Sequence, residues 1–219
     1  MGLAIHSLLA LVALGLVFLA VSGRQPPKNE FADLMFPLQD GTYYVVAGGS
    51  IQLLNPHVAT LRSERFREYR GQSYGIDIVK VNFLGMRASV VASRNPRKYA
   101  IFGDAIYAPC SGIVLDAEDK FRDMPPPEPD RKHMTGNYVL LNCGEYEVFL
   151  GHLQEGAVRV RPGDFIETGA VLGQVGNSGN TENLTCTSTH SDHPGMPVCS
   201  LGIRFRFASM VDSCLGIAG

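Results

Sequence analysis

A glycine-rich stretch at residues 162–180 constrains the fold more than any other part of the sequence. Its glycines stand at positions 163, 169, 173, 176 and 179, with Val, Leu and Ile between them. This spacing predicts short β-strands joined by turns, because glycine adopts the positive φ angles that tight turns need. The stretch indicates a compact all-β domain, and taken alone it is more typical of structure than of chemistry.

Other strand-like runs precede this stretch, with few helix signals between them. Residues 36–38, 41–49 and 51–57 alternate β-forming residues with Gly and Pro, which predicts edge strands and turns. Residues 72–81 and 106–115 predict two further strands. In residues 72–81, Asp77 lies among Ile and Val, where a carboxylate is costly to bury unless it meets a cation or a metal.

The second half of the chain predicts a hairpin and a long loop. Residues 136–143 and 147–153 have the composition of two paired strands. Residues 116–134 are polar and rich in proline, so they predict a long exposed loop. The predicted fold class is all-β, a bent antiparallel sheet around a cleft, with one N-terminal hydrophobic helix.

That helix is predicted at residues 3–21, which are almost uniformly apolar. An apolar run of roughly 20 residues spans a bilayer as a helix. The Ala-Val-Ser sequence at 20–22 fits a signal-peptide cleavage site, but the run is long and no Lys or Arg precedes it. An uncleaved anchor is the favoured interpretation, and cleavage is the alternative. Arg24 and Lys28 follow the run, and under the positive-inside rule they favour the orientation that keeps the rest of the chain in the cytoplasm. This is opposite to the orientation expected of an extracytoplasmic domain.

The five cysteines predict one disulfide. Cys110 and Cys143 lie in two strand-like runs that can pair, and a bridge between them suits an oxidising compartment. Cys186, Cys199 and Cys214 have no clear pairing pattern. Buried free thiols are the alternative for these three.

Short motifs follow one another along the chain in a definite order. They are Tyr-Gly-Ile-Asp at 74–77, Ala-Pro-Cys-Ser-Gly-Ile-Val at 108–114, Gly-Asn-Tyr-Val at 136–139, Gly-His-Leu at 151–153 and Val-Gly-Asn-Ser-Gly-Asn at 175–180. This order resembles the lysostaphin/LytM-type metallopeptidases over roughly residues 40–183. The resemblance implies a duplicated-hybrid-motif β-fold, one zinc ion and cleavage of peptide cross-links in the bacterial cell wall.

The resemblance also implies roles for individual residues. In such enzymes a His, an Asp and the second His of a His-x-His pair hold zinc, and an open position takes water. The metal lowers the pKa of that water and polarises the scissile carbonyl, while two further histidines move protons and stabilise the oxyanion. On this pattern Asp77 is a metal ligand, and His152 is one of the two catalytic histidines.

The first histidine ligand has two candidate positions. In the family it commonly sits four residues before the Asp, where this chain has Ser73, which cannot replace an imidazole alone. Some branches take this ligand from further upstream, and there His57, in Asn-Pro-His, is the candidate. The alternative is that His57 is a surface residue of a turn.

The sequence departs from the family after Asn183. The family continues with a short spacer and Pro-His-Leu-His-Ile-His, which supplies the third ligand and the remaining catalytic histidine. Residues 184–189 instead read Leu-Thr-Cys-Thr-Ser-Thr, and threonine cannot replace imidazole on zinc. The codons CCT-CAC-CTG-CAC-ATC-CAC, after loss of one C, read CTC-ACC-TGC-ACA-TCC-AC and encode that string. We therefore interpret residues 184–219 as an aberrant tail that is out of frame.

Two other interpretations of the tail stay open. One is a pseudoenzyme in which a disulfide between Cys186 and Cys199 closes a new loop. The other is a rebuilt zinc site that uses His190 or His193. The out-of-frame interpretation also accounts for the unpaired cysteines and for a tail without strand periodicity.

The sequence thus predicts an anchor or signal segment at 1–23, a linker at 24–35, a LytM-like peptidase domain at 36–183 and the tail at 184–219. The domain is predicted to be membrane-anchored and extracytoplasmic, or secreted if the segment is cleaved. By resemblance it is a zinc endopeptidase of peptidoglycan, impaired here because two ligands without a third bind zinc weakly. The alternatives are a non-catalytic module that binds cell-wall peptide or regulates an amidase, and a plain tethered β-domain. The formal charge of -2 predicts no binding to nucleic acid.

Overall fold

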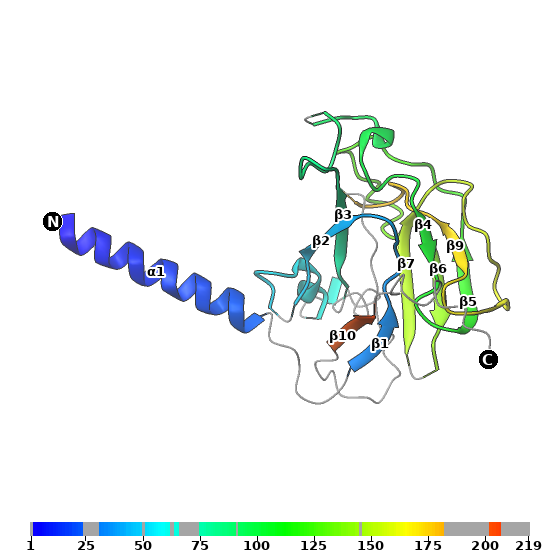
Figure 1. Cartoon of the computed structure of the whole chain (residues 1–219), viewed down its shortest axis with the longest axis horizontal. Helices are drawn as coiled ribbons and strands as arrows, with labels where there is room; N and C mark the ends of the chain where they lie inside the picture. Colours follow the sequence, from blue (N-terminus) through cyan, green and yellow to red (C-terminus); the bar gives the residue numbers. More distant parts are fainter. Residues whose placement is uncertain are drawn as a thin grey trace, which may run out of the picture.

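The computed structural model describes residues 2–23, 31–49, 51–61, 64–65, 75–90, 92–144, 146–181 and 202–206. These residues form one long helix and a set of short strands, which confirms the mostly-β prediction (Figure 1). The helices and strands are α1 (Gly2–Gly23), β1 (Phe31–Met35), β2 (Thr42–Ala47), the 3-10 helix η1 (Pro56–Leu61), β3 (Asp77–Val81), the 3-10 helix η3 (Pro96–Lys98), β4 (Ala105–Tyr107), β5 (Gly112–Glu118), β6 (Asn137–Asn142), β7 (Glu147–Leu153), β8 (Phe165–Ile166), β9 (Val171–Gln174) and β10 (Gly202–Arg206).

Helix α1 confirms the predicted N-terminal apolar helix. Its segment Ala4–Ser22 is long and apolar enough to cross a membrane. Its large apolar side chains are exposed rather than packed against the strands. The helix is consistent with either a membrane anchor or a signal sequence.

The largest sheet has four antiparallel strands in the order β7-β6-β5-β8. Its centre is the predicted hairpin, since β6 pairs with β7 along the length of both strands. Side chains of β6 alternate between buried and partly exposed, which is the period of two expected for a strand with one face in the core. Cys110 and Cys143 form the predicted disulfide beside this sheet, with their Cα atoms 5.8 Å apart.

Three two-stranded sheets surround the four-stranded one. β2 pairs with β3 and β4 pairs with β9, both antiparallel as predicted. β1 and β10 pair in parallel, so the prediction of a purely antiparallel arrangement is wrong at this point. β10 also shows that the tail contains a strand, and β1 lies inside the segment assigned to the linker. Burial of Leu34, which is 3% exposed, explains why that segment is ordered as a strand.

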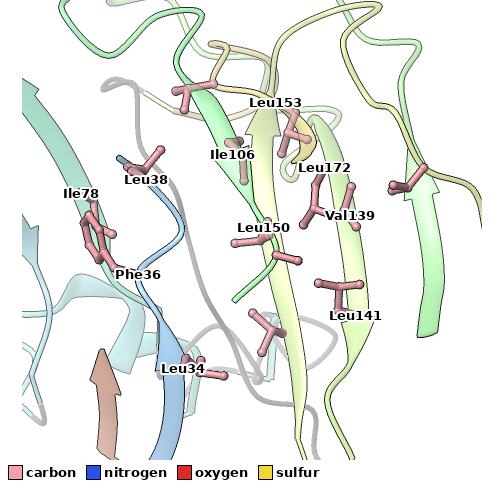
Figure 2. Close-up of a cluster of buried hydrophobic side chains, with 14 of the residues drawn as sticks. Leu34, Phe36, Leu38, Ile78, Ile106, Val139, Leu141, Leu150, Leu153 and Leu172 are labelled. Atoms are coloured by element: carbon pink, nitrogen blue, oxygen red, sulfur yellow. The ribbon is translucent and has the colours of Figure 1, made fainter. Parts of the chain in front are cut away.

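The hydrophobic core lies between the pair of strands β2 and β3 and the larger sheet. Phe36 and Leu38, from the segment after β1, lie beside Ile78 of β3, and Leu34 of β1 belongs to the same cluster (Figure 2). Across from them are side chains of the larger sheet and of β4 and β9, namely Ile106, Val139, Leu141, Leu150, Leu153 and Leu172. These six are at most 1% exposed, so the two halves of the domain share one core.

Some predicted boundaries differ from the observed ones. Residues 51–57 form a turn that leads into η1 rather than a strand, because Asn-Pro favours the start of a helical turn. The strand predicted at 106–115 is interrupted around Pro109, which has no amide hydrogen for a ladder. The long loop begins after Glu118, because β5 continues to that residue.

Candidate functional site

His57 and Asp77 form a hydrogen-bonded pair. Asp77 is the first residue of β3, and His57 lies in η1, where its Nε2 is 3.1 Å from Oδ1 of Asp77. The two side chains are 23% and 20% exposed. The predicted pair is therefore accessible from solvent, and His57 is not an isolated surface residue of a turn.

Asn55 holds the turn that carries His57. This side chain is 1% exposed, and its Oδ1 accepts a hydrogen bond from the backbone N–H of His57 at 3.1 Å. Its Nδ2 donates to the carbonyl oxygens of Gly49, at 3.2 Å, and Gly75, at 3.1 Å. Gly75 lies two residues before Asp77, so one buried amide fixes the backbone near both partners of the His57–Asp77 pair.

His152 lies near the end of β7 in an unusual backbone conformation. Its φ angle is 61°, in the left-handed region that few residues other than glycine adopt. Its backbone N–H donates to the carbonyl of Thr135 at 3.2 Å, and its own carbonyl accepts from Gly176 at 3.1 Å. Strained conformations held by such contacts concentrate at functional sites.

The imidazole of His152 is oriented by Ser178. Nδ1 of His152 lies 2.8 Å from the carbonyl oxygen of Ser178. Because a carbonyl only accepts hydrogen bonds, Nδ1 carries the hydrogen, and Nε2 of the neutral ring keeps its lone pair. This nitrogen is the atom that can accept a proton or a hydrogen bond from a ligand.

A second buried asparagine fixes Ser178. Oγ of Ser178 accepts from the backbone N–H of Asn137 at 2.9 Å and donates to the carbonyl of Leu153 at 2.7 Å. Asn137 is fully buried and bonds through its side chain to both backbone groups of Phe121. At Gly136, an added Cβ would lie 2.5 Å from atoms of Ser178, so a side chain there would separate β6 from the glycine-rich stretch.

The three predicted site residues lie close enough to interact. Burial lowers the pKa of His152, and this effect outweighs the opposite ones of the Ser178 carbonyl and of the Asp77 charge. The neighbouring imidazole of His57 also lowers the pKa of His152. The His57–Asp77 pair and His152 are therefore near enough to influence each other electrostatically, although they come from separate parts of the chain. Ser73, the other first-ligand candidate, lies outside the described residues.

The donor set fits zinc in kind but not in number. His57 and Asp77 offer one imidazole nitrogen and one carboxylate, which are ordinary zinc ligands. No group of three His, Cys, Asp or Glu side chains that could hold a metal occurs in the part of the chain that the structure describes. His190, His193 and Cys186 lie outside that part.

Sequence reasoning missed the residues that orient the site. Asn55, Asn137 and Ser178 do no chemistry themselves, but each fixes the backbone beside a histidine or the aspartate. A signal for them was present, because each asparagine adjoins a residue suited to a turn: Pro56 follows Asn55, and Gly136 precedes Asn137. Only tertiary structure shows that these amides point inward.

A comparison with protein families finds one match. Residues 98–193 match the model of Peptidase family M23. The match includes His152 and the glycine-rich stretch, and begins after His57 and Asp77. No curated protein matches the chain significantly.

Solved structures show weak similarity. One is a putative peptidase M23 from Pseudomonas aeruginosa, with 17% identity and a TM-score of 0.38 over 82% of this chain and 55% of that one, so the chain spans about half of that protein. Two are of SpoIIQ–SpoIIIAH complexes, one described as pore-forming. The pore-forming one has 16% identity and a TM-score of 0.42 over 74% of this chain and 89% of that one. The other has 15% identity and a TM-score of 0.40 over 71% and 88%. Values this low carry no functional information.

Proposed function

We propose, from the Peptidase family M23 domain that the chain carries at residues 98–193, that this protein is an extracytoplasmic LytM-like domain of the zinc endopeptidase lineage that acts on peptidoglycan peptides. Its sheet is proposed to be of the duplicated-hybrid-motif type. As written, the chain is proposed to be catalytically impaired. The disulfide between Cys110 and Cys143 and the apolar helix α1 support a location outside the cytoplasm, anchored to the membrane.

The observation that supports the proposal is the His57–Asp77 pair together with its electrostatic influence on His152. The His57–Asp77 pair supplies two donors suited to a metal, and the lone pair on Nε2 of His152 can accept a proton. The sequence has Thr185 and Thr187 where the family places its His-x-His pair. A site with two donors of three can still bind peptide but loses tight zinc binding.

The incomplete donor set favours a second candidate as well. A non-catalytic module that binds cell-wall peptide, or regulates an amidase, would use the same site without a metal. Such a module needs no zinc site, and the described residues supply too few donors for a closed one. The two candidates predict different zinc binding and peptide cleavage when the missing histidines are restored.

The test compares the chain as written with a variant that carries Thr185→His, Cys186→Leu and Thr187→His. The variant is expected to bind about one zinc ion per chain and to hydrolyse peptidoglycan-type peptides, while the chain as written does neither appreciably. Zinc content by elemental mass spectrometry and peptide cleavage by chromatography are the measurements. The matched control adds Asp77→Asn to the restored variant, and both zinc and activity should fall.

Two results would contradict parts of the proposal. Specific binding to cell-wall peptide by the chain as written, with no cleavage after restoration, would favour the non-catalytic module. Full activity in a restored variant that also carries His152→Gln would remove His152 from the proposed chemistry. Sequencing the gene around codon 183 in independent clones tests the frame separately, since an intact frame would rule out the deletion.

A further inference from the structure

Residues 119–135, the loop between β5 and β6, run along the wall of the site that carries His152. Three backbone hydrogen bonds place the end of this loop. Asp130 N–H donates to the carbonyl of Gly179 at 2.8 Å, Asn180 N–H donates to that of Met134 at 3.0 Å, and the N–H of His152 donates to Thr135. Residues 130–135 therefore lie side by side with residues 178–180 and with His152.

The tip of the loop is held in one conformation by Asp130. Its Oδ1 accepts from the backbone N–H groups of Lys132, at 2.9 Å, and His133, at 3.3 Å. Its Oδ2 lies 2.8 Å from Nδ1 of His133, and this hydrogen bond is the main cause of the lowered pKa of Asp130. The His133 ring stacks on Phe121 with centroids 4.4 Å apart. These contacts order the tip of the loop before any ligand binds, and this reduces the entropic cost of binding.

Acidic side chains of this loop have partners within the protein, whereas two of its basic side chains do not. Asp130 is paired with His133, Glu128 is paired with Arg94, and Asp123 accepts the backbone N–H groups of Asn177 and Glu155. Arg131 and Lys132, by contrast, are exposed, and their side chains form no ion pair or hydrogen bond with any described residue. The tip of the loop, residues 130–133, therefore presents two unpartnered cations beside the site, while these three acids are engaged within the protein.

We propose that Arg131 and Lys132 form a subsite that binds a carboxylate group of a peptide held beside His152. The subsite rests on the proposed function, because it takes the cell-wall peptide as its ligand. A guanidinium binds a carboxylate through two parallel hydrogen bonds, and an ammonium adds a point charge. The formal charge of the chain is -2, which disfavours a polyanion but not a single carboxylate.

The test measures binding of a synthetic peptidoglycan stem peptide to the full chain in detergent. The peptide is compared with the same peptide in which every carboxylate is amidated, by fluorescence anisotropy at low salt. The free-acid form should bind about fivefold more tightly, as expected for solvent-exposed ion pairs. The Arg131→Ala/Lys132→Ala variant should lose this preference, and Arg131→Glu/Lys132→Glu should reverse it.

Arg161 supplies the matched control, since it is exposed and lies in the turn before β8. Arg161→Ala should keep the fivefold preference, and in the unmodified chain the preference should shrink at high salt. Equal binding of the two peptides by the unmodified chain overturns the subsite and leaves the proposed function standing. An equal loss in Arg161→Ala also overturns it, because the preference would then come from overall charge. Binding of neither peptide overturns the subsite and the proposed function together.

Discussion

The two sides of the site are built differently, although a buried asparagine lies beside the histidine on each side. The wall with His152 belongs to the four-stranded sheet, where Val139, Leu141 and Leu150 are fully buried. The wall with His57 and Asp77 consists of η1 and the two-stranded sheet of β2 and β3, and β2 exposes most of its side chains. The comparison shows that the hydrogen bonds of one buried side-chain amide, that of Asn55, can position a site residue where fewer buried strands lie behind it.

The largest difference is expected between apolar substitutions in the two walls. Leu141→Ala should lower the free energy of unfolding by about 4 kcal/mol, because it opens a cavity between well-packed strands. Ile78→Ala should cost about 2 kcal/mol, because the thinner wall can relax around the gap. Denaturant unfolding followed by circular dichroism measures both. Equal losses would show that both walls pack equally well.

Replacing the buried asparagine beside each histidine should change the free energy of unfolding less than the largest apolar substitution does. Asn137→Ala leaves both backbone groups of Phe121 without their partner and should cost about 3 kcal/mol. Asn55→Ala removes bonds from a more exposed turn and should cost about 1.5 kcal/mol. Nitrogen NMR of the His152 ring gives a second measurement. The Nδ1–H form should be lost or mixed in Asn137→Ala and retained in Asn55→Ala, and the opposite pattern would contradict the assignment of walls.

The smallest effect is expected from pH. Burial lowers the pKa of His152 in the folded protein below its unfolded value of about 6.5. The unfolded chain therefore binds more protons in this range, so stability falls as pH decreases from about 6.5 towards the lowered folded pKa. Unfolding curves measured between pH 7 and pH 5 should show this slope, and His152→Gln should reduce it. An unchanged slope in that variant would assign the effect to other groups.

Much of the wall with His152 was predictable from sequence because its signals are local. The hairpin of β6 and β7, the turns of the glycine-rich stretch and the disulfide follow from residue periodicity and turn chemistry. The parallel pairing of β1 with β10 was not predicted, because nothing local joins strands so far apart in the chain.

The site was predictable only in part, and mostly through the family resemblance. His57, Asp77 and His152 were named through the family resemblance, and the structure pairs His57 with Asp77 and places them near enough to influence the pKa of His152. The resemblance said nothing of Asn55 or Asn137, since a buried amide and a surface amide look alike in sequence. The roles of the three site residues remain proposals that the restored variant tests.

The short interval between α1 and β1 limits where the domain can work. The helix ends at Gly23 and the strand begins at Phe31. At no more than about 3.6 Å per residue, this tether reaches roughly 30 Å even when fully extended. If α1 stays in a bilayer, β1 lies within that distance of the membrane surface, whereas a domain released from α1 has no such limit.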